Sequence, residues 1–249
     1  MRFDVLTLFP EMLEAVLGGS IIGRAQKDDL IDLNFVQIRS YSNDKHRRVD
    51  DYPYGGGTGM LMAAQPIYDA YRSVTDGLGY KPHTVYMSPK GSVFNQNTAK
   101  RLLEKKHIVI LCGHYEGVDE RIIETIVDEQ ISIGDFVLTG GEIPAMAVID
   151  AVARMVPGVL SETESYTGES HYNSLLEYPQ YTRPYCFMSK TVPEMLLSGH
   201  HKNIEQWKRQ MALEQTYKYR PDMLCRAALD KNDLKYLEKI KNDSAKKDI

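Results

Sequence analysis

The sequence is poor in cysteine, and this limits the chemistry it can carry. Three cysteines, Cys112, Cys186 and Cys225, occur among 249 residues. They are odd in number, far apart and in no spacing that is typical of a metal site. The sequence therefore predicts no cysteine-based metal centre, and we expect reduced and mostly buried thiols.

Long apolar runs and a strong excess of one charge are also missing. No run approaches the roughly 20 apolar residues that span a bilayer, and the N-terminus enters a strand pattern without an apolar leader. Hydrophobic residues make up 43% and charged residues 26%, which is typical of a soluble globular protein. We expect a cytoplasmic protein with no membrane partner. Because the net charge is -4, a nucleic-acid partner would need a local basic patch.

Three glycine-bearing loops, each after an apolar strand-like run, are the most informative feature that is present. They occupy residues 85–91, 108–117 and 131–142. In an α/β protein, ligands bind beyond the carboxyl ends of parallel strands, and glycine lets the backbone approach a ligand closely. The loops therefore predict one pocket for a small, flat, polar molecule.

Strand and helix patterns alternate along the first 155 residues. Period-two or short buried apolar runs predict strands at residues 3–9, 31–38, 83–87, 108–111 and 131–138. Helical spacing predicts helices at residues 11–27 (interrupted at Gly18 and Gly19), 64–74, 95–106, 119–128 and 143–155. This rhythm is typical of an α/β fold whose mainly parallel sheet is covered on both faces.

The pattern changes beyond residue 158. Residues up to 178 are polar and lack apolar periodicity, which indicates a mobile linker or lid. Helical patterns follow at residues 193–198, 201–219, 221–229 and 232–241, and they predict a small helical domain. The expected boundaries are 1–160 for the first domain, 161–178 for the linker and 179–249 for the second domain.

The shorter motifs are ambiguous when each is taken alone. The glycine turn at residues 54–60 fails the phosphate-loop and dinucleotide-binding templates, and a tight irregular turn is the simpler reading. The loop at 113–117 moderately favours a ligand, whereas that at 140–144 is explained by helix-start chemistry. The cluster at 45–48 is by default a solvated charged face. His200 and His201 have no third ligand at metal spacing, which leaves a structural or phosphate-facing role.

A second basic set lies in the C-terminal helical region. Its members are Lys202, Lys208, Arg209, Lys218 and Arg220, with Trp207, Tyr217 and Tyr219 interleaved. Cations beside aromatic rings suit RNA, in which phosphates are neutralised and bases stack. A helix with an aromatic core face explains this segment equally well.

In combination and in order, the motifs resemble a known family. They are the stretches at residues 51–60, 113–121, 132–142, 181–184 and 197–201, followed by Trp207. Together they resemble the bacterial tRNA (guanine-N1)-methyltransferase that modifies the guanosine 3′-adjacent to the anticodon, at position 37. The resemblance extends over nearly the whole chain.

The resemblance implies properties that the hydrophobic periodicity of the sequence cannot predict. It implies a SPOUT-type catalytic domain with a trefoil knot, a homodimer whose active sites are shared between subunits, a tRNA substrate and S-adenosylmethionine as cofactor. The implied cofactor-binding residues are Tyr86, Ser88, Pro89, Gly113, Tyr115, Glu116, Ile133, Gly134, Asp135, Phe136, Val137, Leu138, Gly140, Gly141 and Pro144. The implied substrate-binding residues are Gly59, Glu177, His200 and Lys208. The family is also associated with magnesium, but the sequence offers no ligand cluster for it.

The chemistry of such a transfer needs a base and a positive charge. N1 of guanine carries a proton and is a poor nucleophile until the proton leaves, and negative charge then accumulates at O6. By resemblance, Arg154 would stabilise O6 and Glu169 would be the base, in place of the family's aspartate. Two alternatives stay open: an RNA-binding protein without activity, and a phosphotransferase that uses the glycine turn.

Overall fold

The computed structural model describes residues 1–162 and 164–245 and divides the chain into two compact units. The first unit is Met1–Thr163 and the second is Glu164–Ile249. Thr163, which falls in the expected linker, lies outside the described residues. Each unit is described by itself.

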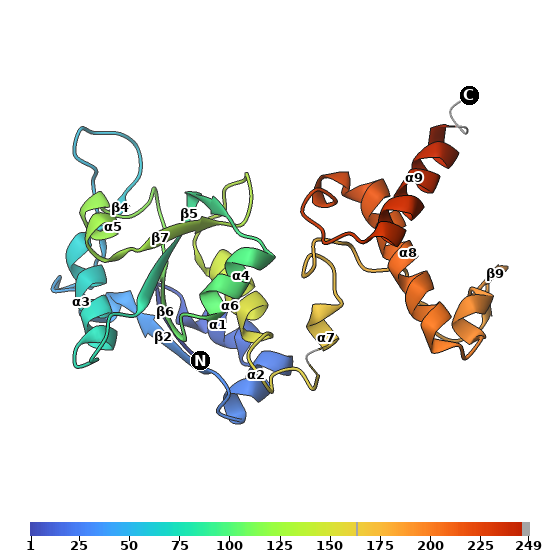
Figure 1. The fold of residues 1–249 in the computed structure, drawn as a ribbon. Helices are drawn as coiled ribbons and strands as arrows, with labels where there is room; N and C mark the ends of the chain where they lie inside the picture. Colours follow the sequence, from blue (N-terminus) through green and yellow to red (C-terminus); the bar gives the residue numbers. More distant parts are fainter. Residues whose placement is uncertain (163, 246–249) are drawn as a thin grey trace. The chain divides into compact units, whose positions relative to one another are not determined.

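A five-stranded parallel sheet forms the centre of the first unit (Figure 1). Its spatial order is β2-β1-β6-β5-β7, and every pair of neighbours runs parallel. The strands are β1 (Arg2–Thr7), β2 (Asp32–Gln37), β5 (His83–Val93), β6 (His107–Cys112) and β7 (Glu129–Ser132). The predicted α/β fold with a mainly parallel sheet is confirmed.

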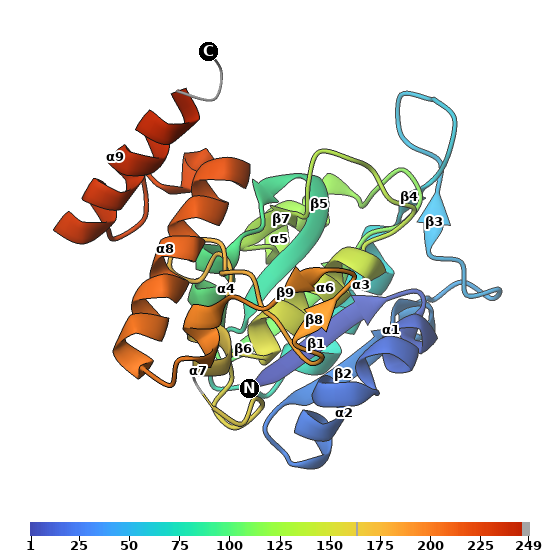
Figure 2. The same cartoon turned by 90° about the vertical axis from the view of Figure 1, so that its right-hand side faces the viewer.

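Helices cover both faces of this sheet (Figures 1 and 2). On one face lie α1 (Pro10–Leu17), α4 (Gln96–Leu103) and α6 (Glu142–Ala153), with α2 (Ser20–Lys27) beside α1. On the other face lie α3 (Ala64–Thr75) and α5 (Glu120–Ile126). The 3₁₀-helix η1 (Ile38–Tyr41) and the short pair β3 (Asp50–Asp51) and β4 (Leu61–Met62) complete the unit.

Strand β6 shows why the sheet needs both layers. All of its residues are buried, and alternate side chains point to opposite faces. Val109 and Leu111 pack in the core beneath α3 and α5, together with Ile67 of α3. Their neighbours Ile108 and Ile110 are completely buried on the other side. A strand that is apolar on both faces is stable only between two helical layers.

The interruption expected at Gly18 and Gly19 is confirmed. Helix α1 ends at Leu17 and α2 begins at Ser20. The corner is tight, because a Cβ on Gly23 would lie 2.1 Å from the carbonyl oxygen of Gly18. Only glycine fits the inside of this corner.

The strand expected at 131–138 is wrong in extent. Strand β7 ends at Ser132, and the chain then leaves the sheet as a loop. The Ser132 hydroxyl donates to the carbonyl oxygen of Gly134 at 2.9 Å, and Gly134 has a φ of 151°, which a strand residue with a side chain rarely adopts. The apolar residues Phe136 and Val137 that suggested a strand are exposed on this loop.

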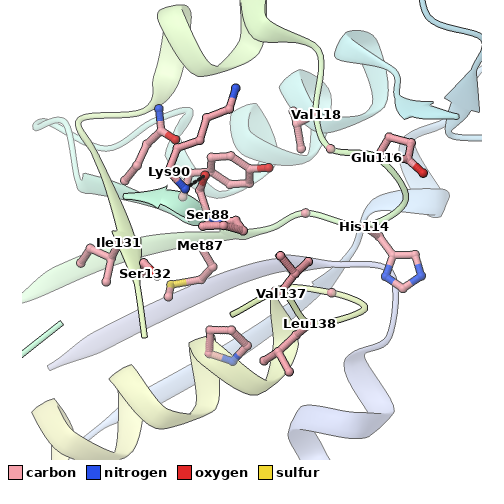
Figure 3. A pocket seen from close by; sticks show the side chains of 18 of the residues that line it. Met87, Ser88, Lys90, His114, Glu116, Val118, Ile131, Ser132, Val137 and Leu138 are labelled. Atoms are coloured by element: carbon pink, nitrogen blue, oxygen red, sulfur yellow. Dashed lines mark hydrogen bonds between the residues drawn. The ribbon is translucent and has the colours of Figure 1, made fainter. Parts of the chain in front are cut away.

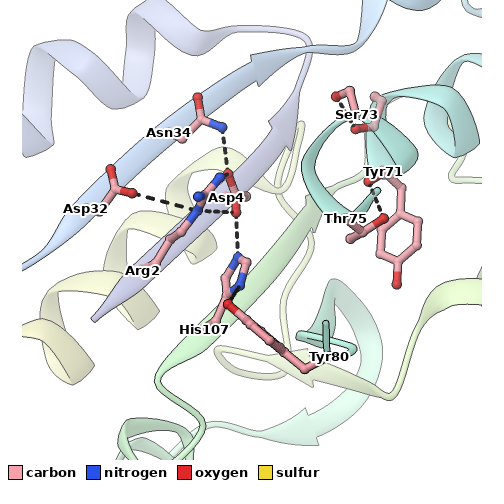
Figure 4. A network of polar contacts seen from close by, with 10 residues as sticks. Arg2, Asp4, Asp32, Asn34, Tyr71, Ser73, Thr75, Tyr80 and His107 are labelled. Atoms are coloured by element: carbon pink, nitrogen blue, oxygen red, sulfur yellow. Dashed lines mark hydrogen bonds and ion pairs between the residues drawn. The ribbon is translucent and has the colours of Figure 1, made fainter. Parts of the chain in front are cut away.

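A buried carboxylate joins the amino-terminal ends of three strands (Figure 4). Asp4 of β1 is fully buried and accepts hydrogen bonds from Arg2 Nε at 2.9 Å and Asn34 Nδ2 at 2.6 Å. Its Oδ2 also lies 2.6 Å from Nε2 of His107 on β6. Burial alone would raise the pKa of Asp4, but these three partners outweigh burial and hold the pKa below its ordinary value.

The second unit is built around one long helix. Its elements are α7 (Glu164–Thr167), β8 (Cys186–Phe187), β9 (Lys190–Thr191), η2 (Glu194–Leu197), α8 (His201–Tyr219), η3 (Pro221–Met223) and α9 (Lys231–Ala245). Leu175, Leu213 and Leu237 form its small core. The backbone N–H of Leu176 donates to Thr216 Oγ1 at 2.8 Å, so residues preceding the helices pack onto α8.

Two expectations for this unit are corrected. The helix expected at 221–229 is only the short η3, because the chain turns to bring Leu224 and Leu229 onto the core. The thiols are not mostly buried: Cys112 is buried, but Cys186 in the β8–β9 hairpin and Cys225 after η3 are exposed. Within the described residues, no helix is long and apolar enough to cross a bilayer.

Candidate active site

A pocket of about 500 Å³ lies beyond the carboxyl ends of β5, β6 and β7, at the edge where the glycine loops leave the sheet (Figure 3). The residues that line it are Leu61, Tyr86, Met87, Ser88, Pro89, Lys90, Gly113, His114, Tyr115, Glu116, Gly117, Val118, Glu120, Ile123, Gln130, Ile131, Ser132, Ile133, Phe136, Val137, Leu138, Thr139, Gly140, Gly141 and Pro144. All three loops therefore contribute to one pocket, as the sequence predicts.

The pocket brings together all of the expected cofactor-binding residues except Gly134 and Asp135. These two belong to the turn after β7 and lie outside the lining. Gly59 is also outside the lining but borders it, since a Cβ there would lie 2.4 Å from Cγ of Glu116. Gly59 has a φ of 95°, so close approach and backbone conformation both require glycine.

The loop after β6 is fixed by the glycine turn that precedes β4. The N–H of Glu116 donates to the carbonyl oxygen of Met60 at 3.0 Å, and the N–H of Met62 donates to that of Gly117 at 2.9 Å. Tyr115 has a left-handed φ of 58°, and its hydroxyl accepts from Arg39 at 3.1 Å. By contrast, a Cβ on Gly55, Gly56 or Gly57 would meet nothing within 4 Å. The close approach expected of this turn is thus confined to Gly59.

The loop before α6 packs directly on the loop after β6. The N–H of Gly141 donates to the carbonyl oxygen of Gly113 at 2.9 Å. A Cβ on Gly141 would lie 2.7 Å from Cα of Cys112, and one on Gly140 would lie 2.4 Å from Oε2 of Glu142. Glu142 is buried and accepts a hydrogen bond from the Thr7 hydroxyl at 2.8 Å. Glycine at 140 and 141 is therefore what lets the two loops touch.

The end of β5 leaves the sheet abruptly. Its register against β7 shifts between Met87 and Ser92, so the residues between them bulge over the pocket. A Cβ on Gly91 would lie 2.4 Å from the backbone of Gln130, and the N–H of Lys90 donates to Ser88 Oγ at 3.2 Å. These contacts fix the backbone that carries Ser88 and Lys90 at the pocket.

The pocket has two chemically different faces. An apolar face is formed by Met87, Ile131, Leu138 and Pro144. The opposite face carries polar groups, and in the view of Figure 3 Lys90 and Glu116 lie on one side of the loop after β6, with Val137 and Leu138 on the other. Such a pocket suits a ligand with a flat apolar part and a charged part.

Two titratable groups at this edge are held in their neutral forms. Burial, followed by the charge of Glu120, raises the pKa of the Tyr86 phenol, whose hydroxyl therefore remains a donor. Burial, followed by the charge of Glu142, raises the pKa of the Cys112 thiol well above its ordinary value. Cys112 is thus an inert core residue and not a nucleophile.

Arg154 lies away from this pocket. It is the C-terminal cap of α6 and is absent from the lining, whereas Pro144 near the start of the same helix is part of it. At about 1.5 Å per residue, the helix separates the two by about 15 Å along its axis. Arg154 and the strand-end pocket of the same chain are therefore not one constellation.

The remaining expected site residues belong to the second unit. Glu169 is half-buried, and its N–H approaches the carbonyl oxygen of Tyr166 at 3.4 Å. Glu177 has its N–H bonded to Ser170 Oγ at 2.9 Å and its carboxylate bonded to Gln180. His200 is exposed at the amino-terminal cap of α8.

Lys208 stands beside aromatic rings, as RNA recognition would favour. Its ammonium lies 5.3 Å from the ring centroid of Tyr178, which in turn meets Trp207 at 6.4 Å. Lys208 also donates to Glu205 at 2.7 Å, and this hydrogen bond raises its pKa. The cation is therefore firmly charged and lies beside two half-buried aromatic rings.

Arg209 and Arg220, from the same basic set, have structural partners. Arg209 makes two bonds to Asp233, including one of 2.7 Å to its Oδ2, and a further bond to the carbonyl oxygen of Ala228. Asp233 is buried, so Arg209 ties α8 to α9. Arg220 pairs with Asp222 at 2.8 Å. Of this set, Lys202, Lys208 and Lys218 are better suited than Arg209 to contact RNA.

Metal ligands do not converge in the described part of the chain. Within residues 1–162 and 164–245, no group of three or more histidine, cysteine, aspartate or glutamate side chains could hold an ion. The association with magnesium stays a prediction.

Known proteins resemble this chain over almost its whole length. A family model described as tRNA (guanine-1)-methyltransferase TrmD matches residues 1–226. A Ruminiclostridium cellulolyticum protein named tRNA (guanine-N(1)-)-methyltransferase is 60% identical over 223 residues, which cover 90% of this chain and 96% of that protein. A protein of the same name from Alkaliphilus oremlandii is 51% identical over 247 residues, covering 97% and 99%. The chain belongs to the tRNA (guanine-1)-methyltransferase TrmD family.

Membership of the TrmD family confirms the resemblance inferred from the motifs. The match includes all three strand-end loops, α6 and helix α8 of the second unit. The TrmD family belongs to the SPOUT class, which agrees with the expected fold class. The methyltransferase activity expected from the motifs agrees with the printed name of the family.

Sequence reasoning missed several residues of the TrmD-family pocket. Lys90 and Gln130 line it, but Lys90 has no predicted role although it lies in the loop at 85–91, and Gln130 belongs to no recognisable motif. His114 is predicted only as part of its loop, yet its ring centroid lies 5.1 Å from those of Phe9 and Tyr115, and its Nδ1 is buried without a hydrogen-bond partner among the described residues. The signal for Lys90 was its place directly after Ser88 and Pro89, while Gln130 gave none.

Proposed function

We propose that this protein transfers a methyl group from S-adenosylmethionine to N1 of guanosine 37 of tRNA. The observation that carries the proposal is the convergence of three glycine loops on one strand-end pocket, in a chain of the TrmD family. The pocket volume of about 500 Å³ is in the range of small-molecule sites.

The residues present fit this cofactor. Gly113, Gly140 and Gly141 line the pocket, and a Cβ on them would lie 2.8, 2.4 and 2.7 Å from neighbouring protein atoms, so only glycine lets the loops pack closely enough to form it. The apolar face made by Met87, Ile131, Leu138 and Pro144 offers a surface for a flat purine. When bound, S-adenosylmethionine supplies an electrophilic methyl group on a sulfonium. The residues of the chain hold it, exclude water and prepare the RNA base.

The guanine needs a base at N1 and a cation at O6. The carboxylate of Glu169 would accept the N1 proton, and the guanidinium of Arg154 would stabilise the charge that develops at O6. A positioned base contributes on the order of 10² to 10⁴ in rate. Glutamate is one methylene longer than the family's aspartate, so its segment would sit slightly farther from the base.

The position of Arg154 supports a homodimer with shared active sites. Because about 15 Å of helix separates it from Pro144, Arg154 would serve a guanine bound at the pocket of a second copy. Exposed apolar side chains near the pocket, Phe136 at 54%, Val137 at 80% and Ile143 at 48%, support a partner surface there. Light scattering should give about twice the mass of one chain.

The flanking segments complete the proposal. Residues 161–178 would act as a lid that delivers Glu169 when tRNA arrives, which excludes water from the flipped base. The aromatic and basic surface around Lys208 and Trp207 would hold the anticodon stem-loop. The enzyme would act in the cytoplasm, where its tRNA substrate is found.

The direct test is methyl transfer from labelled S-adenosylmethionine to an unmodified tRNA transcript. We expect label in a transcript with guanosine at position 37 and none when that guanosine is replaced by adenosine. Equal label in both transcripts, or none in either, would contradict the proposal. Retention of tRNA without any affinity for S-adenosylmethionine would instead identify an RNA-binding protein.

The roles of Glu169 and Arg154 are tested by substitution. Glu169→Gln should bind S-adenosylmethionine with unchanged affinity and lose about 10² to 10⁴ of its turnover, because only the proton acceptor is removed. Arg154→Ala should also lose most turnover with little change in cofactor affinity. Single-turnover rates measure both, and near-normal rates would remove that residue from the mechanism.

A further inference from the structure

The polar face of the pocket carries a cation without an assigned role. Among the described residues that line the pocket, Lys90 is the only lysine or arginine. Its side chain is exposed, and the ion pairs formed by the described residues do not include it. A lone ammonium at the rim of a ligand pocket is suited to an anionic group of the ligand.

The backbone of Lys90 is held in place and is not a free surface loop. The register shift in β5 falls at residues 88–91, of which 88–90 line the pocket, and Gly91 anchors the bulge by its close contact with Gln130. The hydrogen bond from the Lys90 N–H to Ser88 Oγ, at 3.2 Å, closes the turn. The flexible part is therefore only the side chain, which starts from a fixed point at the rim.

An unsatisfied acceptor belongs to a second residue of the pocket lining. Gln130 of β7 is the register partner of Tyr86 on β5, so the two side chains project from the same face of the sheet. The Oε1 atom of Gln130 is buried and has no hydrogen-bond partner within the part of the chain that the structure describes. A buried acceptor without a donor is unfavourable, and a ligand that donates to it removes that cost.

A cation and an orphaned acceptor together match an α-amino acid zwitterion, which carries one carboxylate and one ammonium. We propose that Lys90 binds the carboxylate at the amino-acid end of S-adenosylmethionine, and that Gln130 Oε1 accepts a hydrogen bond from the ammonium at the same end. This inference rests on the proposed function. The adenosine then lies on the apolar face formed by Met87, Ile131, Leu138 and Pro144. This amino-acid subsite consists of Lys90 and Gln130.

An RNA phosphate is a poorer match for the subsite. A phosphate diester has acceptor oxygens but no donor, so it would leave Gln130 Oε1 unsatisfied. The carboxylates of Glu116 and Glu120 also line this pocket and would repel a phosphate, whereas they favour the ammonium of the amino acid. Charge and hydrogen bonding both favour the zwitterion.

The test compares two ligands that differ only at the amino-acid end and the sulfonium. Calorimetry measures the affinity of the full-length protein for S-adenosylmethionine and for 5′-methylthioadenosine, which retains the adenosine but lacks the amino acid. The variants are Lys90→Gln, the charge-retaining Lys90→Arg, and Lys105→Gln, which removes an exposed lysine outside the pocket. Thermal unfolding verifies that each variant is folded.

Lys90→Gln should lower the affinity for S-adenosylmethionine about 3- to 20-fold and leave the affinity for 5′-methylthioadenosine unchanged. This range is that of a charge-assisted contact that solvent partly screens. Lys90→Arg should recover most of the loss, and Lys105→Gln should match the wild type. Gln130→Leu should likewise lower the affinity for S-adenosylmethionine but not that for 5′-methylthioadenosine.

Equal weakening of both ligands by Lys90→Gln, or weakening of neither, would overturn the subsite. The subsite would also be overturned if Lys90→Gln left the cofactor affinity unchanged but raised the KM for tRNA and made tRNA binding less dependent on salt. That result would assign Lys90 to an RNA phosphate. If the wild type binds neither ligand, the proposed function itself fails, and that outcome is distinct from failure of the subsite.

Discussion

Replacing Gly141 with alanine tests whether contact between two loops builds the cofactor pocket. The new Cβ would lie 2.7 Å from Cα of Cys112, 3.0 Å from the backbone nitrogen of Gly113 and 3.1 Å from Cβ of Cys112. Two of these atoms are backbone, and Cys112 is fully buried, so no flexible side chain can yield. The loops must separate, and the 2.9 Å hydrogen bond from Gly141 to Gly113 lengthens.

Overpacking of this kind costs about 1–3 kcal/mol of folding free energy. For a protein of this size each kilocalorie per mole shifts the melting temperature by about 2–4 °C. Because both loops line the pocket, the affinity for S-adenosylmethionine should fall by about tenfold or more. Calorimetry measures the affinity, and thermal unfolding followed by circular dichroism measures the stability.

The matched control is Gly79→Ala. Gly79 lies in a surface turn where a Cβ would meet nothing within 4 Å, and its φ is not in the left-handed range. This variant should bind and melt like the wild type. If Gly141→Ala binds S-adenosylmethionine within twofold of Gly79→Ala and melts at the same temperature, the two loops do not define the pocket.

Three further substitutions probe residues outside the pocket. Asp4→Asn should lose about 2–4 kcal/mol of stability at pH 7, since it breaks a buried charged network. Because the folded pKa of Asp4 is lowered, its contribution is present above about pH 4 and is lost as the pH falls through the folded pKa, so the variant should show a flatter acid limb in urea titrations. An unchanged acid limb would contradict this assignment. Arg209→Gln should lower the melting temperature by uncoupling α8 from α9, whereas Lys202→Gln should weaken tRNA binding in filter-binding assays without affecting stability. The reverse pattern would show that Arg209 contacts RNA.

The alternation of strands and helices could be predicted because burial imposes it. Strand β6 is apolar from Ile108 to Cys112, and α3 carries Ile67, Ala70 and Val74 on one face. Each element can therefore be recognised from the spacing of its apolar residues. The loops that form the pocket were also predictable, because the carboxyl ends of parallel strands share one edge. These inferences need only local pattern and the general geometry of α/β proteins.

Other features depend on contacts that no local pattern encodes. Strand β7 pairs with β5 and not with the preceding β6, and this order alone brings Gln130 beside Tyr86. The apolar run after Ser132 has the hydropathy of a strand, but the turn at Gly134 takes it into the pocket loop. The distance of Arg154 from the pocket became apparent only once α6 had a fixed start and end. Likewise, the sequence favours a phosphate contact for Arg209, whereas the fold pairs it with Asp233 of α9.

Identification of the methylated atom tests the central claim most directly. An unmodified tRNA transcript is incubated with the protein and S-adenosylmethionine, and the product is analysed by reverse transcription and by mass spectrometry of its nucleosides. The account predicts 1-methylguanosine at position 37, with a reverse-transcription stop there because N1 can no longer pair. A transcript that gains no methyl group, or gains it on another atom or another nucleotide, would contradict the account.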